Sequence, residues 1–262
     1  MRMRLPAARP IAVAALTLLA SAAVVPSAHS ADRDYTVTLT TSTDATDFDH
    51  RTVDLTGTLT GPDGTPAANH PVQLEQSVLF RTWNPWGDPI DPTEWETRSL
   101  GTVRTDAEGR FKLEDVPADR WDGRPSPYLN PRHEVMFRAM YDTDNPTDGQ
   151  MAFADAEVSV QPVASSLTYR VSNIIVRAGM RLTVTGKVTW PAGHGPVEGT
   201  RVFLRQYFET EYNAQTTTDA DGNFTINTTV RGYDNEFVLF SAPKDYYISG
   251  VTKKLPIKNI TR

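Results

Sequence analysis

The segment Val53-Asp-Leu-Thr-Gly-Thr-Leu-Thr-Gly-Pro-Asp-Gly64 decides the fold. Val53, Leu55 and Leu59 alternate with polar residues, which is the period of a strand that buries one face. The Pro and Gly that follow favour a tight turn, because Pro fixes φ and Gly accepts a positive φ. The same pattern returns as Leu182-Thr-Val-Thr-Gly-Lys-Val-Thr-Trp-Pro-Ala-Gly193. The sequence therefore predicts the same strand and turn twice.

Three further blocks recur in the same order along the chain. They pair Pro71–Gln76 with Arg201–Gln206, Thr105–Phe111 with Thr218–Phe224, and Glu134–Ala139 with Glu236–Ser241. Four blocks in one order indicate an internal duplication.

The duplicated turns Thr105-Asp-Ala-Glu-Gly109 and Thr218-Asp-Ala-Asp-Gly222 are typical of hairpins. Each fits a type I turn followed by a left-handed glycine. Phe111 and Leu113, and then Phe224 and Ile226, should alternate into a core. No segment after the leader shows a helical period with caps, so we expect an all-β protein made of two tandem β-sandwich domains.

The blocks "TGTLTGPDGTP", "V-x-L" and "TDAEGRF" resemble bacterial immunoglobulin-like and transthyretin-like (carboxypeptidase regulatory domain-like) repeats of secreted actinobacterial proteins. The resemblance covers about residues 35–162 and 163–262 and implies two tandem immunoglobulin-like Greek-key β-sandwich domains. It implies no single function, since such modules serve as spacers, adhesion units, stabilising appendages and ligand binders. We expect domain 1 at 31–162, with two loop insertions, and domain 2 at 163–262. The connector near Gln161–Ser166 should permit limited bending.

The first thirty residues have the character of a signal peptide. They contain no acid, carry three arginines and run apolar from Ile11 through Val25. The small residues Ala28-His29-Ser30 indicate cleavage before Ala31. No later segment is apolar enough to span a membrane. We therefore expect a secreted, extracellular protein.

The charge of the chain bears on its binding partners, and its cysteine content bears on how it is stabilised. The 262 residues have a formal charge of −6, and removing the leader's three arginines leaves 23 basic and 32 acidic residues, a charge of −9. This balance disfavours nucleic acid, whose phosphates need basic patches. The chain has no cysteine, so it must fold without disulfides. We expect a monomer.

Domain 1 carries two insertions relative to domain 2. Gln76 to Thr105 spans 29 positions against 12 in the second copy, and Phe111 to Glu134 spans 23 against 12. Four of the five tryptophans fall in or beside these insertions. Long loops of this kind are often functional.

These aromatic residues allow two interpretations. Proline-stiffened rings can form a platform for a polysaccharide or another extracellular protein, and the candidate ligand-binding residues are Trp83, Trp86, Trp121 and Tyr128. Alternatively, the tryptophans close the ends of the sandwich, or the first insertion is an extra hairpin with Trp95 facing the core.

Metal binding and catalysis have weaker signals. Asp142, Asp144 and Asp148 place three carboxylates close together, as calcium requires, although the same composition is ordinary in a solvated turn. No nucleophile elbow, zinc-protease helix, phosphate loop or dinucleotide fingerprint occurs, so we predict no enzyme and no cofactor. The predicted function is a non-catalytic binding or recognition module using the aromatic loops. The alternatives are a purely structural or adhesive cell-envelope component and a small hydrolase without a recognisable motif.

Overall fold

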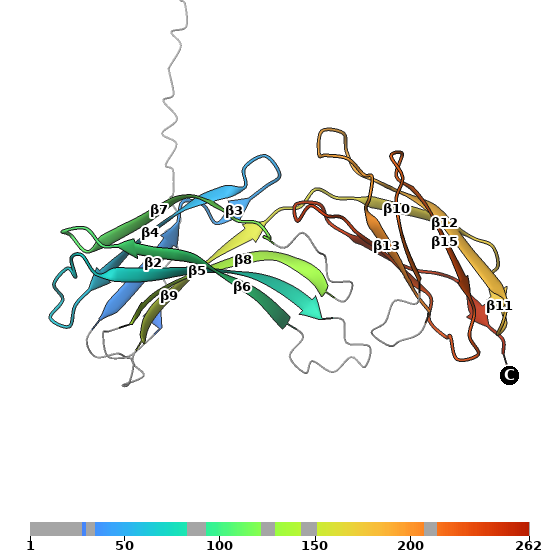
Figure 1. The fold of residues 1–262 in the computed structure, drawn as a ribbon, viewed down its shortest axis with the longest axis horizontal. Coiled ribbons are helices and arrows are strands. Elements are labelled where there is room, and N and C mark those ends of the chain that lie inside the picture. Colours follow the sequence, from blue (N-terminus) through green and yellow to red (C-terminus); the bar gives the residue numbers. More distant parts are fainter. Residues whose placement is uncertain are drawn as a thin grey trace, which may run out of the picture.

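The computed structural model describes residues 28–29, 35–82, 93–121, 129–142, 151–206 and 214–261. Within these ranges the chain is all-β and contains no α-helix, as predicted. None of these residues belongs to a helix long and apolar enough to cross a membrane. Figure 1 shows two sandwiches lying end to end, with the C-terminus at the far end of the second. The predicted signal peptide lies almost entirely outside the described residues.

The first repeat consists of a three-stranded sheet facing a larger one. The smaller sheet has the order β2-β4-β7, and the larger has the order β1-β9-β8-β5-β6 with β3 also paired to β9. The strands of the smaller sheet are β2 (Thr36–Thr41), β4 (Thr52–Thr60) and β7 (Arg110–Pro117). The strands of the larger sheet are β1 (Ala28–His29), β3 (Ala45–Thr46), β5 (Pro71–Thr82), β6 (Thr93–Arg104), β8 (Leu129–Asp142) and β9 (Met151–Val160).

The second repeat has the same topology. Its sheets have the orders β10-β12-β15 and β14-β13-β16-β17, and β11 pairs with β18 in parallel as β3 pairs with β9. The strands are β10 (Ser166–Val171), β11 (Ile175–Val176), β12 (Arg181–Thr189), β13 (Arg201–Arg205), β14 (Ala214–Thr217), β15 (Asn223–Thr229), β16 (Val238–Ala242), β17 (Val251–Lys254) and β18 (Lys258–Asn259). Because the chain crosses between the two sheets at equivalent points in both repeats, each repeat is an immunoglobulin-like Greek key.

The duplicated glycine is explained by two close neighbours, a backbone carbonyl of the paired strand and a phenylalanine ring. Val53, Leu55 and Leu59 of β4 are buried, whereas Gly57 leaves room for the ring of Phe111 on β7. A Cβ on Gly57 would clash with the backbone oxygen of Thr38 on the paired strand β2, and it would lie 2.2 Å from Cζ of Phe111. Gly186 and Phe224 repeat this arrangement in the second sandwich, where the corresponding distance is 2.6 Å.

The predicted turns are confirmed. The amide of Gly109 donates to the carbonyl of Asp106 at 3.0 Å, and Gly109 has a φ of 71°. The equivalent amide of Gly222 donates to Asp219 at 2.9 Å with a φ of 83°. Each glycine thus takes the left-handed position that the hairpin requires.

A buried glutamine occupies the same place in both repeats. Nε2 of Gln76 donates to the carbonyls of Pro117 and Asp119, at 3.0 and 2.9 Å. Nε2 of Gln206 donates to Oδ2 of Asp234 at 2.9 Å. Each amide ties the larger sheet to the segment that leaves the smaller one, so the duplication extends to the polar core.

The first insertion lengthens the β5–β6 hairpin. The pairing continues through Arg81 and Thr93, well beyond the equivalent strands β13 and β14. β1 belongs to the predicted signal peptide and pairs with β9. Cleavage before Ala31 would therefore remove β1 and leave that part of the β9 edge unpaired.

Candidate functional site: the junction between the repeats

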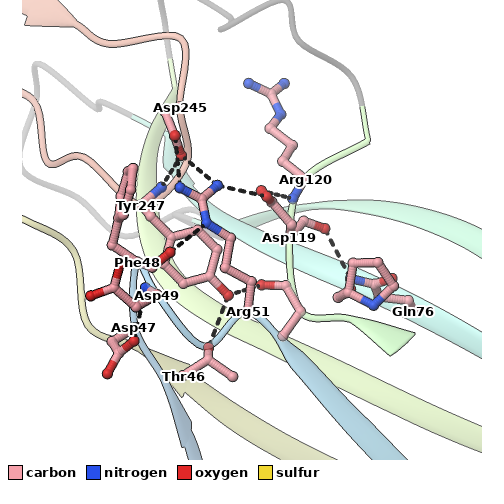
Figure 2. Close-up of polar contacts among 12 residues, drawn as sticks. Thr46, Asp47, Phe48, Asp49, Arg51, Gln76, Asp119, Arg120, Asp245 and Tyr247 are labelled. Atoms are coloured by element: carbon pink, nitrogen blue, oxygen red, sulfur yellow. Dashed lines mark hydrogen bonds and ion pairs between the residues drawn. The ribbon is translucent and has the colours of Figure 1, made fainter. Parts of the chain in front are cut away.

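The loop between β16 and β17 of the second repeat packs into the end of the first repeat. Its residue Tyr247 is 0% exposed and belongs to the hydrophobic core of the first repeat. The phenol donates to the carbonyl of Ala118 at 2.7 Å and lies 3.0 Å from Oγ1 of Thr46, as Figure 2 shows. Burial raises the pKa of Tyr247 to about 12. One repeat therefore completes the core of the other.

Arg51 links the two repeats through charge and ring contacts. Its guanidinium donates to both carboxylate oxygens of Asp245, at 3.0 and 2.8 Å. The guanidinium carbon lies 4.3 Å from the ring centroid of Phe48 and 4.4 Å from that of Tyr247. Bidentate pairing combined with stacking fixes orientation as well as distance. Burial is the largest single influence on the pKa of Arg51 and lowers it, but the hydrogen bonds and charges of Asp245 and Asp119 together outweigh burial and raise this pKa.

Asp119 adds a second carboxylate beside Arg51. Its Oδ2 lies 3.4 Å from Nη1 of Arg51. Burial raises the pKa of Asp119 despite the amide of Arg120 and the charge of Arg51, since Arg51 is shared with Asp245. The cluster consequently holds one cation between two carboxylates from different repeats.

A second set of contacts lies on the other side of the loop. The ring centroids of His133 and Tyr246 are 5.2 Å apart, and the hydroxyl of Tyr246 donates to the carbonyl of Glu134 at 3.4 Å. Nδ1 of His133 is buried and has no hydrogen-bond partner among the described residues. Burial lowers the pKa of His133, and a hydrogen bond to the backbone of Tyr246 only partly offsets it. Burial on this side of the junction therefore favours the neutral imidazole.

The connector between the repeats is itself bound to the loop. The amide of Val163 donates to the carbonyl of Tyr247 at 2.8 Å, and the amide of Ser249 donates back to Val163 at 3.0 Å. Oγ of Ser165 donates to the carbonyl of Ser249. These bonds oppose the bending that the composition of the connector suggests, because bending would break the backbone ladder.

The structure describes two of the predicted ligand and metal residues, Trp121 and Asp142. Trp121 packs against the first core, and its ring centroid lies 4.9 Å from the guanidinium carbon of Arg98. Asp142 is exposed at the end of β8. The other candidates, Trp83, Trp86, Tyr128, Asp144 and Asp148, fall outside the described residues. Their binding roles stay predictions.

The interpretation that placed Trp95 toward the core is wrong. Its side chain is 49% exposed. A bulge between Leu74 and Glu75 of β5 accommodates an extra residue of β6 beside Gly101, whose φ is 102°. One extra residue inverts the alternation, so Trp95 lies opposite Leu79 on the outer face rather than sharing the inner face with Val103.

Sequence reasoning missed the residues that build the junction. The available signal was the pair Tyr246-Tyr247 in a hairpin loop, where two adjacent aromatic residues are unusual for a solvated turn. Their partners Thr46, Arg51 and Ala118 lie far away in sequence.

Comparisons with known proteins identify no family. No family model matches the chain, and no curated protein matches it. Among solved structures, a tetra-tandem repeat from the extending region of a large adhesion protein is 15% identical, with a TM-score of 0.37, and the match covers 84% of this chain and 48% of that one. The Yersinia pseudotuberculosis adhesin InvE is 14% identical, with a TM-score of 0.37 and coverage of 87% and 61%. This chain thus spans about half to three fifths of those chains, and similarity at this level carries no argument about function.

Proposed function

We propose that this protein is a non-catalytic, extracellular structural component whose two repeats form one stiff unit. The observation that carries the proposal is the burial of Tyr247, a residue of the second repeat, in the core of the first. Domains joined only by a linker are expected to move relative to one another, whereas a buried hydrophobic contact between them opposes this motion. The proposed function of this unit is to keep the surfaces of its two repeats at a fixed separation and angle.

Charge and backbone contacts support the same function. Arg51 and Asp245 make a bidentate pair across the junction, and Val163 pairs with the loop through its backbone. The bridge orients the repeats and the ladder limits their rotation. No disulfide is needed, which agrees with the absence of cysteine.

Secretion is part of this proposal and rests on the predicted leader at residues 1–30. The proposed division into domains at 31–162 and 163–262, a monomeric state, and the finer kinship with transthyretin-like actinobacterial repeats also remain proposals. Recognition through Trp83, Trp86, Trp121 and Tyr128 also remains a proposal and would require a ligand test. The hydrolase alternative gains no supporting geometry from the described residues.

The test is a distance distribution between spin labels in the full chain. Because the sequence has no cysteine, Thr102→Cys on β6 and Thr185→Cys on β12 introduce two unique labelling sites at exposed positions. We expect one narrow distribution for the parent protein and a broad one after Tyr247→Ala. Tyr233→Ala, which alters an exposed tyrosine of the second repeat, is the matched control and should stay narrow.

A broad distribution in the parent protein would contradict the proposal. So would a narrow distribution in Tyr247→Ala, because the junction would then be dispensable for stiffness.

A further inference from the structure

A pocket of about 330 Å³ lies on the outer face of the larger sheet of the first repeat. Strands β5, β6, β8 and β9 all contribute to it, and Figure 1 shows these strands side by side. It is lined by Leu79, Trp95, Arg132, Glu134, Met136 and Glu157. Val78 and Val135 next to these positions are fully buried in the core, so the pocket residues alternate to the opposite face. The volume is at the lower end for small-ligand sites.

The apolar part of the pocket is built around the indole of Trp95. Leu79 lies directly opposite Trp95 in the β5–β6 register, and Met136 lies on the next strand. Trp95 remains about half exposed, although tryptophan usually buries most of its surface in a folded protein. A flat exposed ring beside an apolar floor suits a ligand that has its own apolar face.

The polar rim offers both donors and acceptors. Nε of Arg132 lies 3.3 Å from Oε2 of Glu134, so this pair is neutral overall. Glu157 forms no ion pair with any described residue. The pocket thus carries one net negative charge, which disfavours anionic ligands.

The rim is held in place by the repeat junction. Between Val78 and Phe80 of β5 the register shifts, so that Arg132, His133 and Glu134 form a bulge, with His133 at a φ of 57°. The carbonyl of Glu134 accepts the hydroxyl of Tyr246. Fixed polar groups lower the ordering cost of binding.

We propose that this pocket binds one ring of a neutral glycan. The C–H face of the sugar stacks on Trp95, its hydroxyls donate to the carboxylates of Glu134 and Glu157, and Arg132 donates to a ring or hydroxyl oxygen. Neutral sugars combine an apolar face with peripheral hydroxyls, which matches the flat indole inside a mixed polar rim. The net negative charge also attracts a lysine side chain, but its narrow aliphatic chain offers the indole less flat apolar surface than a sugar ring does. This inference goes beyond the structural function and does not depend on it.

The test uses the full chain and neutral oligosaccharides of glucose and of N-acetylglucosamine, with binding followed by calorimetry. We expect one of these probes to bind and Trp95→Ala to weaken binding about tenfold or more, since an aromatic anchor dominates such a contact. Glu157→Gln should weaken it by a smaller factor. Trp190→Phe, a tryptophan change in the second repeat, is the matched control and should leave the affinity unchanged.

Three outcomes would overturn the proposal. They are no binding of any neutral probe at millimolar concentration, equal affinity of Trp95→Ala and the parent protein, and salt-sensitive binding of a lysine-rich peptide at this pocket in place of the sugars. Circular dichroism and the thermal midpoint should be near the parent values for Trp95→Ala, because the ring lies on the solvent side. A failure here leaves the spin-label result for the junction unaffected.

Discussion

Replacing Tyr247 should destabilise the first repeat although the residue belongs to the second. Tyr247→Ala removes a side chain with 0% exposure from the core that contains Leu55, Val53 and Val116. Truncation of a buried aromatic residue typically costs about 3–5 kcal/mol, because the cavity collapses only partly. Tyr247→Phe keeps the ring but leaves the carbonyl of Ala118 without its 2.7 Å partner, a loss of about 1–3 kcal/mol. The two variants should therefore form a graded series.

The assay is urea unfolding followed by tryptophan emission in a Trp190→Phe background. The four remaining tryptophans precede residue 122, so the emission reports only the first repeat. We expect the free energy of unfolding of this repeat to fall in the order parent, Tyr247→Phe, Tyr247→Ala. Tyr233→Ala changes an exposed tyrosine and should shift the same transition by less than about 0.5 kcal/mol.

An unchanged emission transition in Tyr247→Ala would refute the reasoning. A loss of stability confined to the second repeat, seen by far-ultraviolet circular dichroism without a change in emission, would refute it equally.

Other changes probe the glycine contact, the buried histidine and the buried amide. Gly57→Ala places a methyl group 2.2 Å from Phe111 Cζ, so calorimetry should show a loss of about 1–3 kcal/mol, and an unchanged thermal midpoint would contradict this packing. Burial lowers the folded pKa of His133 below 6.5, so its contribution to stability is complete above pH 6.5 and is lost as the pH falls through the folded pKa. His133→Asn, which tolerates the left-handed backbone, should reduce that acid dependence in urea titrations between pH 5.5 and 7. The raised pKa of Asp119 changes stability with pH in the opposite sense, but it is common to the parent protein and the variant. Identical pH profiles of the two proteins would disprove the role of His133. Gln76→Leu leaves two carbonyls without a donor and should cost about 2–4 kcal/mol by chemical denaturation, and a neutral result would show that the amide is dispensable.

The architecture was predictable because its signals are local. Alternation in Val53–Leu59 and the glycine turns at Gly109 and Gly222 depend on neighbouring residues, and the structure confirms both. Because the sequence is duplicated, each local pattern occurs twice, and a pattern that occurs twice in the same order seldom arises by chance. Topology followed from the same blocks, since equivalent blocks occupy equivalent strands.

The candidate site was not predictable by the same reasoning. The face on which Trp95 lies depends on the bulge at Gly101, and a single extra residue reverses every side chain before it. The junction depends on contacts such as Tyr247 with Ala118, which no periodicity encodes. Trp121 is an intermediate case. Its contact with Arg98 depends on where the β5–β6 hairpin places Arg98, and the length of that hairpin could not be read from the sequence.

The insertion of Tyr247 also sets an order of assembly during translation. The first repeat emerges from the ribosome before the second, yet its interior is filled only when the β16–β17 loop has been synthesised. Early domains of most multidomain proteins mature while later ones are still being made. Here the earlier module reaches its full stability only when the later one has been made, so a nascent chain interrupted between them would lack the side chain of Tyr247 in its first core.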